Sequence, residues 1–405
     1  MDGENSRMYK RGKKEKIKYR PIPVREILLE MKNLSELMID LAYSAALFGD
    51  KDLAEDVIEL EERIDTLAYF LNMAVMLAAR DAEDAKILSG VAKVASAADK
   101  ISDAAGDIAN IVLHEIGVHP IIADIFEKVE ERLARIKILE DSPIVRMKIS
   151  NLDPASMGID IIAIRRGGDW VINPKEDEVI RGGDIIIVRG VQDGINGFRE
   201  KVGEKIVKGE EEIIRKIVWE DRFKDVIKYF VELKDISELM IDLAYSALML
   251  NSKELAEEVQ KLEEYIDELH TKFELLVLSS GFVESEAKGI LGLIRLGVAA
   301  ERISDAAAEI AEIILRGIEP HPVLRMTVES AEETVVYAKV SQSSALIGKT
   351  LREARIPEET GIWVLAIKRG DKIIRPKPDT RIEAGDIIIA AGYSQGREDL
   401  ISLVS

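Results

Sequence analysis

The segment Ser35–Ala46, with the sequence SELMIDLAYSAA, returns 202 residues later as Ser237–Leu248, with the sequence SELMIDLAYSAL. The two copies differ only at their last residue. The same offset relates GDIIIVRG at 183–190 to GDIIIAAG at 385–392, so the duplication covers almost the whole chain. A repeat of this period gives the architecture A-B-A′-B′, in which each copy consists of one A unit and one B unit.

The A units have the apolar spacing of helices. In unit A, apolar residues recur at helical intervals, and Gly49 interrupts the pattern. Three helices are predicted, at 24–48, 53–79 and 82–114. Because the turns between them are short, these helices should form an antiparallel bundle. Unit A′ repeats the pattern from 226 to 315.

The B units change to short apolar runs. After a helical connector predicted near 126–135, the runs ARIKIL at 134–139, IDIIAIRRG at 159–167 and GDIIIVRG at 183–190 are separated by Gly, Pro and Asp, which is typical of strands. In unit B′ the matching strands come with a short helical segment at 348–356. Each B unit is thus a small α+β unit of about 70 residues, and a sheet this small has edges that favour a partner.

The predicted fold class is α+β multidomain, in which three-helix bundles alternate with small α+β domains by tandem duplication. The piece between B and A′ is polar and charged, with helical stretches, and we interpret it as a connector. The expected segments are a basic flexible tail (1–22), a first bundle (23–118), a first small domain (119–195), the connector (196–223), a second bundle (224–320) and a second small domain (321–405).

The bulk composition restricts the function. A formal net charge of −19 argues against a nucleic-acid binder, because phosphate binding needs a basic surface. The absence of cysteine excludes disulfides and thiolate metal sites, and it fits a reducing cytoplasm. Since crossing a bilayer takes about 20 apolar residues, more than any stretch here offers, a cytoplasmic protein without a transmembrane segment is expected. The basic tail is either a solvated arm or a contact with anionic lipid, which would make the protein peripheral at the membrane.

The third helix of each copy carries a row of acidic residues. Asp99, Asp103 and Asp107 share one stripe, although like charges four residues apart destabilise a helix by about 0.2–0.5 kcal/mol per pair. Because the row lies opposite the apolar face, it is a solvated surface in the simplest interpretation. The alternative is a site for a divalent or iron ion, because (i, i+4) pairs on neighbouring helices can bring four carboxylates together. The candidate metal ligands are Glu61, Asp65, Asp99, Asp103, Glu263, Asp267, Glu301 and Asp305.

Polar residues beside the strand ends of the B units are the second candidate site. One interpretation is ordinary hairpin charges. The other is a phosphate or nucleotide site, because the fork of an arginine grips phosphate at two points. The four histidines are not assigned as ligands, since two precede prolines at turns and two have no counterpart in the other copy. The candidate effector-binding residues are Arg165, Arg166, Asn173, Arg369 and Arg375.

These residues resemble two known families. The A units are similar to the three-helix repeat of PhoU, a phosphate-regulation adaptor marked by recurring ExxxD or DxxxD pairs, which stand here as ERISD at 301–305 and DKISD at 99–103. The B units resemble the C-terminal domain of TrkA and RCK proteins, which regulate potassium transporters and channels, through SALIGKTLREARI at 344–356 and the strands after it. The first resemblance implies a carboxylate metal site, and the second implies nucleotide effectors at a dimer interface. A chain that joins both looks like archaeal proteins described as potassium-channel-related.

The resemblance implies a function in ion transport. The chain would be a regulatory subunit of cation, above all potassium, transport, which senses a small ligand through its TrkA-C-like units and docks on a membrane transporter or channel subunit. A homodimer is expected. Two alternatives stay open, a phosphate-signalling adaptor and a metal-storage protein. The sequence contains no GxGxxG after a strand, so NAD is not expected. It also lacks GxSxG, Walker, HExxH and cysteine nucleophile signatures, so an enzyme is not expected.

Overall fold

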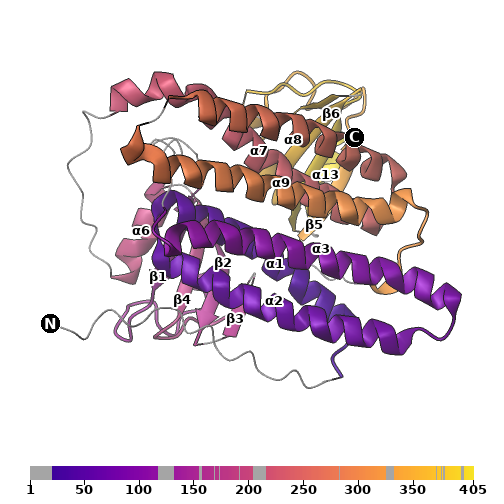
Figure 1. Ribbon diagram of the computed structural model, residues 1–405, viewed down its shortest axis with the longest axis horizontal. Coiled ribbons are helices and arrows are strands. Elements are labelled where there is room, and N and C mark those ends of the chain that lie inside the picture. Colours follow the sequence, from indigo (N-terminus) through magenta and orange to yellow (C-terminus); the bar gives the residue numbers. More distant parts are fainter. Residues whose placement is uncertain are drawn as a thin grey trace.

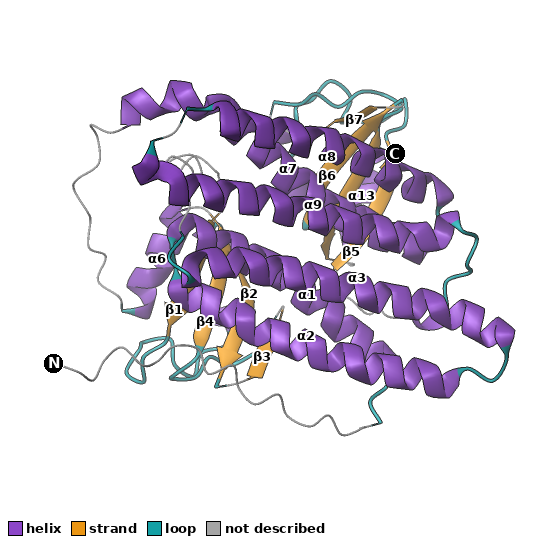
Figure 2. Ribbon diagram, in the orientation of Figure 1, coloured by secondary structure: helices purple, strands orange, loops and turns teal. Residues whose placement is uncertain are grey.

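The computed structural model consists of two three-helix bundles that lie side by side, each with a four-stranded sheet packed beside it (Figures 1 and 2). The order along the chain is bundle, sheet, bundle, sheet, which confirms the predicted fold class. In the part of the chain that the structure describes, no helix is long and apolar enough to cross a membrane. The described residues are 21–116, 132–154, 157–167, 169–172, 174–190, 192–203, 216–281, 283–324, 333–370, 372–374, 376, 379–393 and 396–405.

The helices of the first bundle begin and end at residues with a local reason to do so. Gly49 ends the first helix with a φ of 64°, a left-handed conformation that glycine adopts without strain. The Asp50 carboxylate then accepts a hydrogen bond from the Leu53 N–H at 3.0 Å and caps the second helix, and Asp81 caps the third in the same way. The bundle consists of α1 (Val24–Phe48), α2 (Lys51–Ala78) and α3 (Ala82–Leu113).

The second bundle repeats this arrangement. Its first helix starts at Lys216, inside the predicted connector 196–223, so part of that connector extends the bundle. Ser252 caps the next helix by accepting a hydrogen bond from the Leu255 N–H. The elements are α7 (Lys216–Leu250), α8 (Lys253–Ser279), the short 3-10 helix η2 (Glu284–Glu286) and α9 (Ala287–Leu315).

Both sheets are antiparallel and have the same topology. The strand order is β1-β4-β2-β3 in the first sheet and β5-β8-β6-β7 in the second, and the second strand of each copy carries a register shift at its pairing with the central strand. The strands are β1 (Arg132–Lys137), β2 (Ile159–Arg166), β3 (Asp169–Ile172), β4 (Ile185–Gly190), β5 (Glu333–Lys339), β6 (Ile362–Arg369), β7 (Lys372–Ile374) and β8 (Ile387–Tyr393). The helices of the small domains are α5 (Ile149–Leu152), α6 (Gln192–Val202), α11 (Leu351–Ala354), α12 (Ile356–Thr360) and α13 (Arg397–Val404).

Two segments of the first small domain differ from the sequence prediction. Residues 132–133, predicted as part of a helical connector, are strand, because they pair with the central strand β4; they extend the strand run predicted from residue 134. The domain also continues past residue 195, since α6 buries Phe198 and Val202 against the sheet. The predicted tail, 1–22, lies outside the described residues except at its last two positions.

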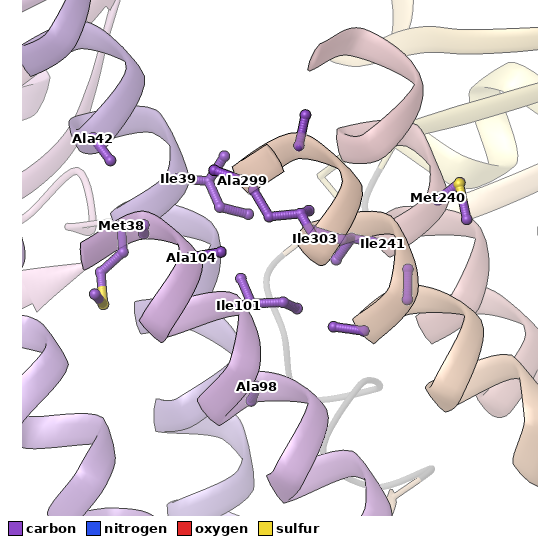
Figure 3. Close-up of a cluster of buried hydrophobic side chains, with 14 of the residues drawn as sticks. Met38, Ile39, Ala42, Ala98, Ile101, Ala104, Met240, Ile241, Ala299 and Ile303 are labelled. Carbon is purple, nitrogen blue, oxygen red and sulfur yellow. The ribbon is translucent and has the colours of Figure 1, made fainter. Parts of the chain in front are cut away.

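The two bundles meet through equivalent residues. Ile39 of α1 and Ile101 of α3 face Ile303 of α9 and Ile241 of α7 across the contact (Figure 3). These four side chains are at most 3% exposed. Ile241 and Ile303 are the repeats of Ile39 and Ile101, so the same surface of each copy packs against its counterpart. This is the arrangement of a two-fold symmetric dimer, formed here within one chain.

Candidate functional site

The first candidate site lies between α2 and α3. The (i, i+4) pairs Glu61–Asp65 and Asp99–Asp103 face each other there, and we call these four residues the first carboxylate cluster. The Glu61 carboxylate rests on Gly106, where an added Cβ would overlap it. Burial, followed by the charges of Asp103 and Asp65, raises the pKa of Glu61 to about 7. Burial, followed by the same two neighbours, raises the pKa of Asp99 to about 6.

The second candidate site repeats this one between α8 and α9. The second carboxylate cluster consists of Glu263, Asp267, Glu301 and Asp305. One carboxylate oxygen from each of Glu263, Asp267 and Asp305 lies within 4.8 Å of the others, a spacing at which they could share one ion. Burial is the largest cause that raises the pKa of Glu263, and the nearby carboxylates of Asp267 and Asp305 add to it.

Both clusters suit a hard or borderline cation. Burial is the largest cause that raises the pKa values of Asp103 and Asp305, and repulsion by neighbouring carboxylates adds to it; a cation would offset this repulsion. Among the described residues, the predicted ligands that bring three carboxylate oxygens within 4.8 Å of one another are Glu263, Asp267 and Asp305. The other five interact electrostatically with neighbouring acids but form no such group; they are Glu61, Asp65, Asp99, Asp103 and Glu301. Both Asp103 and Asp305 remain exposed, so an ion could reach them from solvent.

The third acid of each row lies at the contact between the two bundles instead of in a carboxylate cluster. Asp107 forms an ion pair with Arg302, and Glu309 forms one with Lys100, in both cases across the contact between the bundles. Glu309 also lies 3.6 Å from Lys93. Since Arg302 repeats Lys100 and Glu309 repeats Asp107, these ion pairs are reciprocal. Basic residues of the other copy thus form ion pairs with the last acid of each row and partly neutralise its charge. The sequence alone did not indicate these pairs.

One residue of the second site was missed from the sequence. His270 of α8 has its Nδ1 3.8 Å from Oε2 of Glu301. His270 was not predicted as a ligand because its counterpart in the first copy is Ala68. The signal that could have found it is its spacing, three residues after Asp267, which places both side chains on one face of the helix. By contrast, Nδ1 of His321 accepts a hydrogen bond from the Val323 N–H at 3.1 Å, as suits a turn residue.

The predicted effector-binding arginines that the structure describes are held by acidic residues. Arg166 reaches Asp184 at 2.9 Å, and Arg369 reaches Asp386 at 2.8 Å, each by two parallel hydrogen bonds within its own small domain. Arg165 instead leaves its sheet and pairs with α2. Asn173 and Arg375 lie outside the described residues. These contacts do not test nucleotide binding, which stays a prediction.

Arg165 belongs to an ion-pair group that fixes the first sheet on its bundle. Its guanidinium binds Asp56 and Glu59 of α2, and Arg135 of β1 adds contacts of 3.3 Å to Asp56 and 3.1 Å to Asp52. Asp56 is 1% exposed, and its burial raises its pKa although both arginines act to lower it. Asp56 was not among the predicted site residues; its signal in the sequence is an acid on the otherwise apolar stripe of its helix.

The second copy has a weaker version of this group. Glu258, the repeat of Asp56, lies 3.8 Å from Lys368 of β6. Apolar side chains complete the contact in both copies. Ile162, Ala163 and Ile187 of the first sheet, and Ala366 and Ile389 of the second, join the same buried cluster as the helices. In each copy the helix that carries half of the carboxylate cluster therefore also carries the sheet.

Comparison with known proteins assigns the repeated units to two domain families. Residues 28–112 and 230–314 match the family model of the PhoU domain, and residues 133–203 and 335–405 match that of the TrkA-C domain. Among curated proteins, potassium channel protein 1 of Methanocaldococcus jannaschii is 40% identical over 18% of this chain and 22% of its own length. The Ktr system potassium uptake protein C of Bacillus subtilis is 34% identical over 26% of this chain and 47% of its own length.

The solved structures similar to this chain include the crystal structure of PhoU from Pseudomonas aeruginosa. It is 16% identical, with a TM-score of 0.41, over 73% of this chain and 96% of its own. The chain thus spans less than half the length of the two curated relatives and nearly all of this structure. The matched residues agree with the domains seen in the structure, including the extension of the first small domain to residue 203.

Proposed function

Because the chain is built of two PhoU domains that alternate with two TrkA-C domains, we propose that it is a regulatory subunit of potassium transport. In this function the PhoU domains bind metal ions at the two carboxylate clusters. The TrkA-C domains sense a small ligand and contact a transporter or channel subunit in the membrane. The chain itself supplies neither a pore nor catalysis in this proposal.

One observation carries the proposal. Helix α2 bears Asp56, which holds the TrkA-C sheet through Arg165, and little more than one turn later it bears Glu61 of the first carboxylate cluster. A metal ion that pulls Glu61 and Asp65 toward α3 acts on the same rigid helix that carries the sheet. Such coupling changes a partner's affinity only if the ion prefers one arrangement of helix and sheet over another.

The donor set supports hard or borderline ions at both clusters. The described ligands are carboxylates, with one histidine beside the second cluster, and the chain has no cysteine. Magnesium, calcium, manganese, iron and zinc all accept such ligands. Elemental analysis of protein purified without chelator tests this part. Bound metal that is lost on Asp103→Ala together with Asp305→Ala supports it, and metal-free protein contradicts it.

A nucleotide is the proposed ligand of the TrkA-C domains, at Arg166 and Arg369. Each guanidinium is already engaged by a buried carboxylate, Asp184 or Asp386, so a phosphate would have to share or replace that partner. Thermal unfolding in the presence of individual nucleotides tests the proposal, because a ligand that binds only the folded state raises the melting temperature. No stabilisation by any nucleotide would remove this part and leave the rest standing.

Affinity capture from membranes tests the transport function as a whole. Tagged protein should recover a potassium transporter or channel subunit, and Arg165→Met, which loosens the first TrkA-C sheet, should weaken this recovery. Lys51→Ala is the matched control, because the ion pair of Lys51 with Glu115 is exposed and includes no residue of the sheet. Recovery of a phosphate transporter or a histidine kinase would favour a phosphate-signalling adaptor instead, and recovery of no membrane protein would favour metal storage.

A further inference from the structure

The two TrkA-C sheets rest on their bundles through equivalent positions that carry different side chains. Three arginines of the first sheet reach acidic side chains of the first bundle, and they are Arg135 of β1, Arg165 of β2 and Arg189 of β4. In the pairing register of the strands, their counterparts in the second sheet are Tyr337, Lys368 and Ala391. Only one of these three residues is charged. The second sheet therefore has one cation at the positions where the first sheet has three.

The charged contact of the first copy is close and involves two helices. Arg165 forms ion pairs with Asp56 and Glu59 of α2 at the same time, and its side chain is only 21% exposed. Arg189 adds a longer contact of 3.9 Å to Asp40 of α1. Arginine suits such a place, because its planar guanidinium forms several hydrogen bonds in a fixed geometry and is less strongly hydrated than an ammonium group. The first sheet is thus fixed on its bundle by directional contacts.

The single cation of the second sheet shares its partner with a lysine of the helix. Nζ of Lys368 lies 3.8 Å from Oε2 of Glu258, which is too far for a hydrogen bond. Nζ of Lys261 lies 3.4 Å from the same oxygen. Lys261 stands where the first copy has Glu59, one of the two acids that bind Arg165. An acid that holds the first sheet is therefore replaced in the second copy by a cation, which repels Lys368.

The apolar part of the contact is similar in the two copies. Ala163 and Ile187 of the first sheet are buried in the cluster that the sheet forms with the helices. Their counterparts in the second sheet, Ala366 and Ile389, are buried in the same way. The two contacts therefore differ mainly in their charged groups.

The second TrkA-C domain also has a core of its own, which does not depend on the bundle. This core includes Ile388 and Ala390 of β8 and Leu400 of α13. Its described members all lie between residues 336 and 404, within the domain itself. The domain can therefore separate from its bundle without unfolding.

We infer that the second TrkA-C domain detaches from its bundle as a unit, and that it does so more readily than the first. The first TrkA-C domain is then a fixed part of the double bundle, and the second is the part that moves. Detachment exposes Ala366 and Ile389 of the sheet together with Glu258 of α8. This inference goes beyond the proposed function, and it requires neither bound metal nor a bound effector.

Cysteine labelling of the full chain tests this inference, because the chain has no cysteine of its own. Ala163→Cys and Ala366→Cys each place one thiol in the buried contact between one sheet and its bundle. A buried thiol reacts with a reagent such as DTNB only when a local opening exposes it, so the two rates compare how often each contact opens. After correction for the rates in urea, Ala366→Cys should react at least about tenfold faster than Ala163→Cys.

Two controls separate detachment from other events. Ala390→Cys lies in the domain's own core and should react much more slowly than Ala366→Cys, because detachment leaves that core closed. Lys261→Glu combined with Lys368→Arg gives the second copy the charges of the first, and it should slow the labelling of Ala366→Cys. Circular dichroism shows whether each variant is folded. Ile187→Cys and Ile389→Cys supply a second matched pair at the same two contacts.

Three results would overturn the inference. The first is that the thiols in the second contact react no faster than those in the first. The second is that Ala366→Cys and Ala390→Cys react at equal rates, because the domain then unfolds instead of detaching. The third is that the exchange of charges leaves the labelling rate unchanged. None of these results bears on the proposed function, which metal analysis and affinity capture test on the wild type.

Discussion

At the scale of single residues, Glu61 has the most strongly shifted pKa of the first carboxylate cluster. Its burial and the nearby charges of Asp103 and Asp65 raise its pKa to about 7. A carboxyl group with such a pKa changes charge near neutral pH, and a metal ion has to displace its proton. Metal binding to the first cluster is therefore expected to strengthen as the pH rises through 7, which a titration at pH 6 and pH 8 would measure.

The same pKa shift makes the metal-free protein less stable at higher pH. The folded state holds the Glu61 proton more tightly than the unfolded state, whose pKa is near 4.5, so stability falls as the pH rises from about 4.5 through 7. Glu61→Gln removes this titration. In the presence of chelator the variant should melt about 1–2 °C above the wild type at pH 8 and level with it at pH 4. Equal pH dependence in the two proteins would contradict the assignment.

Gly106 is the residue that gives Glu61 its place. In Gly106→Ala the new Cβ would overlap the Glu61 carboxylate, which must then turn out of the cluster. We expect metal affinity at the first cluster to fall about tenfold, a loss typical of disturbing a group that positions a ligand. Isothermal titration calorimetry measures it. Ala308→Gly, at the same place in the second bundle, is the control and should not weaken binding.

At the scale of helices and strands, much of the structure could be predicted from the sequence. The apolar spacing predicted α1 at its observed bounds and α2 and α3 to within two residues, because each of them buries one continuous stripe. The strand at 132–133 and the membership of α6 in the first small domain were not predicted. Both depend on contacts with a sheet formed by distant residues, which local spacing cannot indicate.

The contact between α2 and the first TrkA-C sheet depends on a buried ion pair. Asp56 has a raised pKa in spite of two arginines, so the free-energy cost of its burial exceeds their attraction. Removing one partner should therefore be costly: Arg165→Met is expected to destabilise the protein by about 2–4 kcal/mol. Asp56→Asn combined with Arg165→Met should recover part of this loss, which urea unfolding would measure as a coupling between the two changes.

The exposed pair of Lys51 with Glu115 supplies the control for this prediction. Its side chains are 59% and 73% exposed, so Lys51→Ala should cost less than about 1 kcal/mol. If Arg165→Met is equally mild, the buried pair does not hold the sheet on the helix. The proposed link between metal binding and sheet position would then lose its support.

At the scale of the whole molecule, the two copies form a reciprocal interface. Lys32 lies 5.4 Å from the ring centroid of Tyr245, and Lys234 lies 5.3 Å from that of Tyr43, so these contacts are also exchanged between equivalent positions. The sequence predicted the duplication, and the three carboxylates that converge in the second bundle are among its candidate ligands. It could not predict which faces of the bundles meet, because a solvated stripe and an interface stripe carry similar charges.

This interface should hold without the covalent link. A protease site introduced at residues 204–215 would release two fragments, each of one PhoU and one TrkA-C domain. Because the contact is mainly apolar, through residues such as Ile101 and Ile303, the fragments should elute together in gel filtration even at about 1 M salt, which screens the exposed ion pairs. Separate elution at low salt would show that the link, rather than the packing, holds the copies together.

The reciprocal interface also bears on how such a molecule can change over generations. In an assembly of two identical chains, any substitution appears on both sides at once and has to be tolerated at both. Here a single reading frame encodes both sides, so their ratio is always one to one and each side is free to acquire substitutions alone. His270 opposite Ala68 is a difference of this kind, and an assembly of identical subunits could not have kept it on one side.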